Sequence, residues 1–125
     1  MPSPTPEPFH TRGFRFSCAI VRLYTKLAKL PDVPPYLARQ VLRSGTSIGA
    51  NLEEGKGAQT RRDIAAKFSI ALKEARETAY WLKLLKATEL APPTILQPLL
   101  SEAGELVAIL TVARRKLNTT TRGTK

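Results

Sequence analysis

The sequence predicts an all-α fold, an antiparallel up-down-up-down four-helix bundle. Apolar residues recur at alternating spacings of three and four in four separate segments, which is the pattern of amphipathic helices. Proline or glycine separates the segments, and none of them shows the two-residue alternation of a strand. The 125 residues can bury a core without disulfides or metal. Helices joined by such short connections pack most simply as an up-down bundle.

The bundle is expected over residues 13–117, after a proline-rich flexible arm over residues 1–12. Four of the ten prolines fall in the first eight residues, and this composition favours an extended arm. The first helix ends at Pro31, because proline lacks the amide donor and its ring clashes with the preceding turn. Its apolar positions are Phe16, Ile20, Leu23, Leu27 and Leu30.

The second helix contains two glycines four residues apart, Gly45 and Gly49. Each costs about 1 kcal/mol relative to alanine inside a helix, so close packing must compensate. We therefore predict a tight contact with another helix or another subunit at this place. Gly55 is expected to end the helix as a left-handed C-terminal cap. The apolar positions are Leu37, Val41, Ile48 and Leu52.

The third helix begins at Thr60, where Asp63 takes the place of the usual Glu or Gln of a capping box. It runs without glycine or proline up to Pro92, and the fourth helix opens at Pro92–Thr94. Residues 118–125 are expected to form a basic flexible tail. The core is predicted to centre on Leu23, Leu27, Val41, Ile48, Phe68, Leu82, Leu106 and Leu110.

The chain carries a large excess of positive charge, with 20 Lys and Arg against 10 Asp and Glu. This net charge of +10 favours nucleic acid as a partner over a merely solvated surface. Aromatic residues make up only 6 %, which leaves little means of stacking on bases, so phosphate contacts with little sequence dependence are expected. The candidate nucleic-acid-binding residues are Arg15, Arg22, Lys26, Lys29, Arg62, Arg76, Lys83, Arg114, Arg115 and Lys116.

The sequence contains patterns that suggest enzymatic chemistry, but each lacks a feature that the chemistry requires. One cysteine and one histidine exclude an intrachain disulfide and the common zinc sites, and no cofactor is expected. Residues 45–49 match the nucleophile pattern G-x-S-x-G, but that motif needs a preceding strand and a later histidine. Lys56 is followed by Gly57 rather than by the Ser or Thr of a phosphate-binding loop. We predict that the protein is not an enzyme.

The acidic pair Glu74 and Glu77 shares one helix face, but no histidine stands at the spacing that di-iron bundles use. We interpret the pair as salt-bridged carboxylates at the surface or at an interface. Trp81 follows Glu74 by seven residues on the same edge and could anchor a partner subunit. The predicted subunit interface therefore consists of Gly45, Gly49, Glu74, Glu77 and Trp81.

No uninterrupted apolar run approaches the roughly 18 residues of a membrane span. The N-terminus lacks the basic and apolar regions of a signal peptide. A cytoplasmic protein without a membrane partner is expected.

Two stretches of the sequence resemble the bacterial four-helix-bundle proteins: Gln40–Gly55 (QVLRSGTSIGANLEEG) and Ala71–Leu82 (ALKEARETAYWL). These are also called ribosomal RNA intervening-sequence proteins, since some are encoded inside insertions in large-subunit ribosomal RNA genes. The resemblance covers about Phe14 to Leu117 and implies a homopentamer with a central channel and no catalytic residue. The chain is also similar to the accessory variability determinant of diversity-generating retroelements, a basic bundle that binds nucleic acid and a reverse transcriptase.

We therefore expect a non-enzymatic oligomeric bundle that binds RNA or DNA, with RNA slightly preferred. The alternative is a protein-interaction scaffold or accessory subunit, for example of a reverse transcriptase, whose charge serves only solubility. The two differ in their response to salt, because phosphate contacts release counterions.

Overall fold

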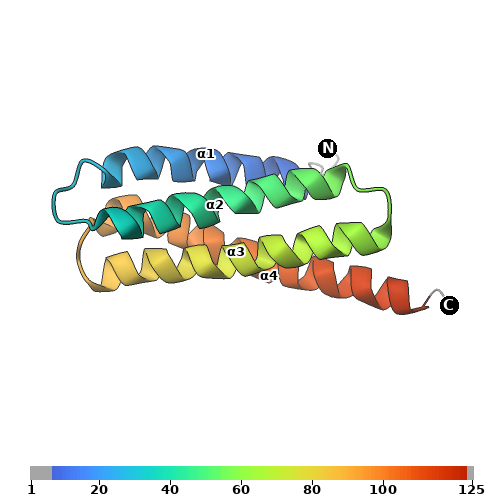
Figure 1. Cartoon of the computed structure of the whole chain (residues 1–125). Helices are drawn as coiled ribbons and strands as arrows, with labels where there is room; N and C mark the ends of the chain where they lie inside the picture. Colours follow the sequence, from blue (N-terminus) through green and yellow to red (C-terminus); the bar gives the residue numbers. More distant parts are fainter. Residues whose placement is uncertain (1–6, 124–125) are drawn as a thin grey trace, which may run out of the picture.

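The computed structural model describes residues 7–123, with side chains up to Asn118, and this part of the chain forms four helices and no strand. The helices are α1 (Phe9–Leu27), α2 (Pro35–Lys56), α3 (Arg61–Ala87) and α4 (Pro93–Gly123). They lie along one common long direction, and the connections alternate between the two ends of the molecule (Figure 1). The prediction of an all-α fold with four helices is confirmed.

The bundle extends further at both ends than the sequence predicted. Helix α1 begins at Phe9, because the Arg12 amide donates to the Pro8 carbonyl at 3.0 Å and the Phe9 ring meets Phe68 edge to face at 5.5 Å. Residues 9–12 are therefore helical rather than part of an arm, and residues 1–6 lie outside the described residues. Helix α4 continues to Gly123, since no proline or glycine interrupts it after Gly104, so residues 118–123 of the predicted tail are helical, and residues 124–125 lie outside the described residues.

The ends of α2 and α3 test two capping predictions. The Thr60 side chain accepts a hydrogen bond from the Asp63 amide at 3.1 Å, so the predicted cap of α3 is confirmed. The prediction for Gly55 is wrong: it lies inside α2, and the cap is Gly57, with φ at −88°. Gly55 is buried because α3 packs over it, and a Cβ there would lie 3.4 Å from Cβ of Lys67.

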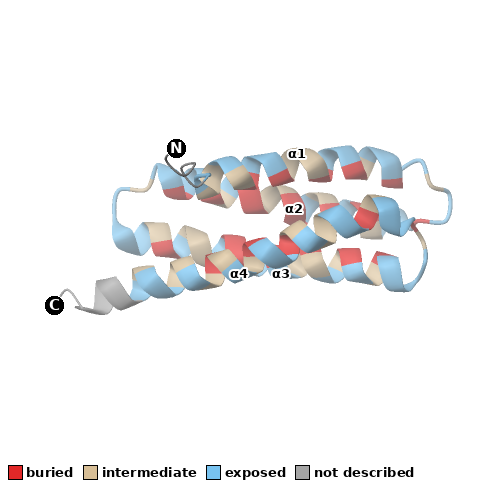
Figure 2. Ribbon diagram, turned by 180° about the vertical axis from the view of Figure 1, so that it is seen from behind, coloured by how far each residue is buried: buried red, intermediate tan, exposed pale blue. Residues whose placement is uncertain are grey.

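Buried hydrophobic residues form one core cluster, and all four helices contribute to it. Figure 2 marks the buried positions in red along the helices. Seven of the eight predicted core residues are at most 2 % exposed: Leu23, Leu27, Val41, Ile48, Leu82, Leu106 and Leu110. Phe68 is only partly buried, because it lies near the end of the bundle and packs against Phe9 at the margin of the core.

Glycines allow α1 and α2 to approach each other closely. A Cβ on Gly49 would lie 2.8 Å from the Gly13 carbonyl oxygen, and a Cβ on Gly45 would lie 2.6 Å from Cγ1 of Ile20. The Ser17 hydroxyl donates to the Gly45 carbonyl at 3.2 Å across the same contact. The predicted tight helix–helix contact is thus present inside one chain. The assignment of Gly45 and Gly49 to a subunit interface is wrong, because α1 already covers both.

Candidate nucleic-acid interface

Helix α1 carries a stripe of exposed cations at spacings of seven and four residues, Arg15, Arg22 and Lys26, and these spacings place them on one side of the helix. The fourth predicted cation, Lys29, is also exposed but lies in the turn that follows α1, which ends at Leu27. Arg22 and Lys26 also line a shallow groove of about 280 Å³ between α1 and the N-terminal half of α4. Within the described residues, Arg22, Lys26 and Lys29 have no carboxylate within 4.0 Å. Their charges are therefore available to an anionic ligand.

Arg15 differs from the other three because it is paired with Glu7. Its Nε donates to the Glu7 carboxylate at 3.1 Å, and a second guanidinium nitrogen pairs with the other carboxylate oxygen. The pair lies at the surface, where it lowers the local net charge rather than adding much stability. Arg15 is thus a weaker candidate for phosphate binding than the sequence predicted.

A network around Arg12 connects α1 to α4 and was not predicted. Arg12 donates to the two oxygens of Glu102 at 2.8 and 2.9 Å and to Glu105 at 2.5 Å. The hydrogen bond from Arg12 lowers the pKa of Glu102 below its usual value of 4.5. These residues are 90 and 93 positions apart, so no local pattern could pair them. The network matters because α1 and α4 make far fewer contacts than the helices that follow one another in the chain.

Replacing Glu102 with glutamine is expected to destabilise the bundle by about 1 kcal/mol at pH 7, because both side chains are partly screened by solvent. Since the folded-state pKa of Glu102 is lowered, its contribution is complete above about pH 4.5 and is lost as the pH falls through that lower pKa. The free energies of unfolding of the variant and the wild type, measured in urea, should therefore differ at pH 7 and become equal in acid. Glu53→Gln, which removes an exposed pair at 3.9 Å, is the control. A difference that stays constant with pH would contradict the prediction.

The α3 cations Arg62, Arg76 and Lys83 are exposed and have no carboxylate within 4.0 Å among the described residues. Helix α3 packs along α2 and α4, whereas it meets α1 at the end of the bundle, where the Phe68 ring contacts Phe9. The structure therefore does not bring the α1 and α3 cations together on one continuous surface. It separates them onto different sides of the bundle.

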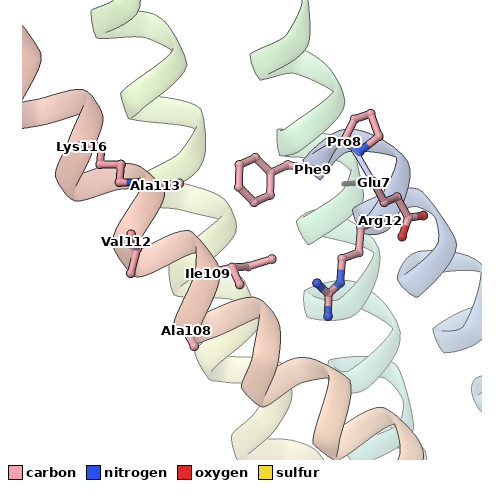
Figure 3. A pocket seen from close by; sticks show the side chains of 9 residues that line it. All are labelled: Glu7, Pro8, Phe9, Arg12, Ala108, Ile109, Val112, Ala113 and Lys116. Atoms are coloured by element: carbon pink, nitrogen blue, oxygen red, sulfur yellow. The ribbon is translucent and has the colours of Figure 1, made fainter. Parts of the chain in front are cut away.

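The predicted cations near the C-terminal end of α4 differ in how far they are exposed to solvent. Arg115 is exposed, whereas Arg114 is half-buried and its Nε is buried without a hydrogen-bond partner in the described structure. Arg114 is thus less open to solvent than Arg115, and its role as a phosphate ligand stays a prediction. Lys116 lines a hollow of about 900 Å³ where α4 diverges from α1, with Phe9 and Ile109 among its apolar walls (Figure 3).

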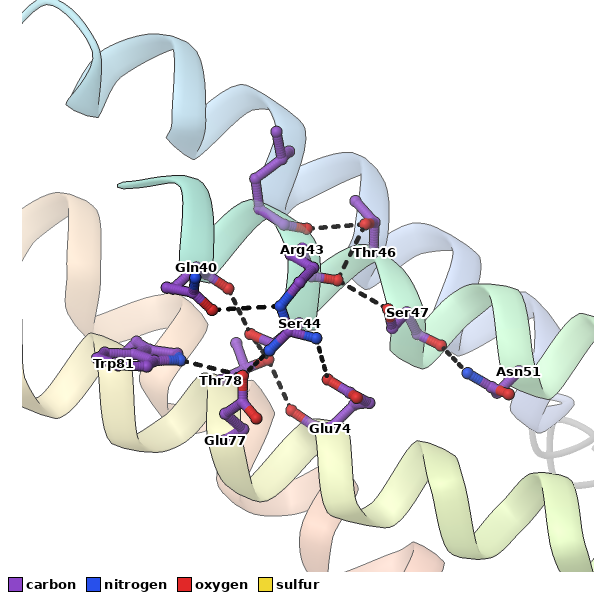
Figure 4. Close-up of polar contacts among 11 residues, drawn as sticks. Gln40, Arg43, Ser44, Thr46, Ser47, Asn51, Glu74, Glu77, Thr78 and Trp81 are labelled. Atoms are coloured by element: carbon purple, nitrogen blue, oxygen red, sulfur yellow. Dashed lines mark hydrogen bonds and ion pairs between the residues drawn. The ribbon is translucent and has the colours of Figure 1, made fainter. Parts of the chain in front are cut away.

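A polar network between α2 and α3 holds the predicted acidic pair (Figure 4). Arg43 contacts Glu74 at 3.3 Å and also pairs with Glu77, and the Trp81 indole donates to Glu77 at 3.2 Å. The interpretation as salt-bridged carboxylates is confirmed, with Arg43 as the partner. Glu74 is only 9 % exposed, so it is enclosed within one chain, while an interface role for Glu77 and Trp81 stays a prediction. Among the described residues no three His, Cys, Asp or Glu side chains group as a metal site would require.

Deeper in the same contact, the Thr78 hydroxyl donates to the Ser44 hydroxyl at 2.8 Å, and both side chains are fully buried. Polar side chains of the two stretches that carry the family resemblance thus join α2 to α3, while Gly45 and Gly49 of the first stretch pack against α1. Residues 9–112 match the model of the family described as 23S rRNA-intervening sequence protein. The chain belongs to this family.

A solved structure from Bacteroides thetaiotaomicron shares the fold of this intervening-sequence protein. It is described as a protein of unknown function from the S23 ribosomal protein family and is 37 % identical to the chain. The similarity covers 86 % of this chain and 95 % of that chain, with a TM-score of 0.78. No curated protein matches the chain. The predicted family resemblance is confirmed.

The intervening-sequence protein exposes aromatic side chains that the composition did not predict. Tyr36 on α2 and Tyr80 on α3 are 55 % and 57 % exposed, and both rings contact Trp81 edge to face. The few aromatic residues of the chain thus include rings that are open to solvent. A low aromatic content does not determine whether the few rings are buried.

Helix α4 of the intervening-sequence protein is the most apolar helix of the described residues, and Val112 is the large apolar side chain that it exposes. Over Pro93–Asn118 it is long and apolar enough to cross a membrane by length and composition, with a mean hydropathy of 1.4. Only 22 % of this apolar window is buried inside the single chain. Glu102 and Glu105 interrupt the apolar residues, which is why no unbroken apolar run marked this helix in the sequence.

Proposed function

We propose that this protein is a non-enzymatic, self-assembling bundle that binds nucleic acid, preferably RNA, through the phosphate backbone. The observation that carries the proposal is the group of exposed cations without an ion-pair partner among the described residues, Arg22 and Lys26 on α1 and Lys29 in the turn after it. Contacts of this kind position a polyanion without reading its sequence. The alternating ends of the helix connections support an antiparallel up-down-up-down arrangement of each subunit (Figure 1).

Self-assembly is part of the proposal, because one group of three cations can engage only a few phosphates. A homopentamer would present about five such groups and a total charge of about +50, so that several contacts form together. The surface that we propose for assembly is an exposed side of α4 that borders the hollow beside α1 and carries small or uncharged residues. These are Ser101, Gly104, Ala108 and Val112.

Ala108→Glu is expected to dissociate the assembly, because it places a charge in an apolar contact that would exclude water. Ala108 is exposed in the single chain, so the helical content of the subunit should be unchanged. Light scattering measures the mass, and circular dichroism checks the fold. Ala66→Glu places the same charge at an exposed alanine of α3 as the control. A wild-type mass of one chain, or an unchanged mass in Ala108→Glu, would contradict assembly through α4.

Binding to mixed-sequence RNA is expected to weaken steeply with salt. Three phosphate contacts give a log–log slope of about −2 to −3, which corresponds to a loss of about 20- to 50-fold between about 50 and 200 mM salt. Fluorescence anisotropy with labelled RNA and duplex DNA measures this slope. A flat salt dependence, or no binding at low salt, would favour the alternative of a protein-interaction scaffold, for example one that serves a reverse transcriptase.

A further inference from the structure

Three aromatic rings form a small cluster on the outer surface between α2 and α3, which we call the α2–α3 aromatic patch: Tyr36, Tyr80 and Trp81. The ring centroids of Tyr36 and Trp81 are 6.2 Å apart, and those of Tyr80 and Trp81 are 5.1 Å apart. Trp81 is partly buried against the core, whereas more than half of each tyrosine side chain is open to solvent. The patch therefore presents two ring surfaces on a fixed base.

The base of the patch is held in place by the network described above. The hydrogen bond from the Trp81 indole to Glu77 fixes the indole, and Arg43 neutralises this carboxylate. The two tyrosines rest on the indole, so a ligand that packs on them meets rings whose orientation is already restricted. Preordered rings bind at a lower cost in conformational entropy than mobile ones.

Exposed cations flank the patch on both helices: Arg39, Arg76 and Lys83. On α3, Arg76 precedes Tyr80 by four residues and Lys83 follows it by three, and these spacings make them neighbours on one helix face. On α2, Arg39 follows Tyr36 by three residues in the same way. None of the three cations has a carboxylate within 4.0 Å among the described residues. The rings therefore lie in a positively charged surrounding.

We propose that unpaired bases of single-stranded RNA stack on the α2–α3 aromatic patch while the flanking cations contact the adjacent phosphates. The combination of stacking rings and cations along a backbone path is the usual means of binding a single strand without sequence preference. Bases in a duplex are already stacked on each other and cannot reach such rings. This inference rests on the proposed nucleic-acid binding and specifies its ligand. It uses the outer surface between α2 and α3 rather than the α1 cations.

The test compares single-stranded and duplex RNA of equal length, about 12 nucleotides or base pairs. Tyr80→Ala and Tyr36→Ala are each expected to weaken binding of oligouridine by about 5- to 100-fold, because each removes a stacking ring. Binding of the duplex is expected to change by less than about twofold. Tyr80→Phe keeps the ring and should bind oligouridine like the wild type. Phe14→Ala removes a ring that is 66 % exposed on α1 and is the matched control.

Trp81 is the only tryptophan of the chain, so its fluorescence reports on the patch directly. Oligouridine is expected to quench it in the wild type and in Tyr80→Phe. Unchanged oligouridine affinity in both alanine variants would overturn the inference while leaving the proposed function intact. An equal loss in Tyr80→Phe and Tyr80→Ala would also overturn it, and so would a change of mass in light scattering, which would identify the patch as a subunit contact. A wild type that binds neither RNA at low salt would overturn both proposals.

Discussion

Replacing Gly49 with leucine is expected to prevent the bundle from folding. A Cβ at this position would meet the Ser17 hydroxyl and lie 2.8 Å from the carbonyl oxygen of Gly13 and 3.2 Å from its carbonyl carbon. Backbone atoms cannot move aside as the end of a flexible side chain can, so α1 would have to separate from α2. Overpacking that a core can absorb costs about 1–3 kcal/mol, and a branched side chain against backbone should exceed this range. Such a loss is comparable to the total stability of a small domain.

Circular dichroism at increasing urea concentration measures the effect. Gly49→Ala is the milder variant and should lower the free energy of unfolding by about 1–3 kcal/mol, although alanine is the better helix former. Gly57→Ala is the control, since a Cβ there would have one neighbour at 3.8 Å and its φ of −88° is accessible to any residue. A Gly49→Leu protein with wild-type stability would show that α1 and α2 do not approach as described.

Reversing two charges on α1, Arg22→Glu with Lys26→Glu, is expected to reduce RNA affinity by at least about 100-fold at about 50 mM salt. The double substitution removes two phosphate contacts and places two like charges against the backbone. Both side chains are exposed and have no ion-pair partner among the described residues, so the fold should be unaffected. Anisotropy measures the affinity, and light scattering checks that the mass is unchanged.

The control is Lys56→Glu with Lys86→Glu, which changes the net charge equally at two exposed lysines outside the α1 stripe. It should weaken binding by much less, because the α1 contacts remain. Equal losses in the two variants would mean that only the total charge attracts RNA. Arg15→Glu provides a further comparison, and its effect should be smaller than that of Arg22→Glu because Glu7 already compensates Arg15.

Much of the fold could be predicted because its signals are local. The spacing of Ile20, Leu23 and Leu27 identifies the buried side of α1 without reference to any other helix. The Thr60 cap likewise depends only on residues three positions apart. The helix ends were less predictable, because Phe9 belongs to α1 through its contact with Phe68, a residue 59 positions later.

The candidate site could be predicted only in part, because exposure and ion pairing depend on segments far apart in the chain. The sequence placed Arg15 and Arg22 in one stripe, but only the structure pairs Arg15 with Glu7. It gave no reason to connect Arg43 with Glu77, because the two residues are 34 positions apart on different helices.

The four helical segments, the apolar side of each and the net charge of +10 follow from the sequence alone. Periodicity and composition suffice for these properties, because each belongs to one helix or to the sum of residues. The packing of Gly49 against α1, the exposure of Tyr80 and the burial of Glu74 depend on how the helices are arranged. The distance and direction of the neighbouring helices determine which side chains are covered, and the periodicity of one helix contains no information about them.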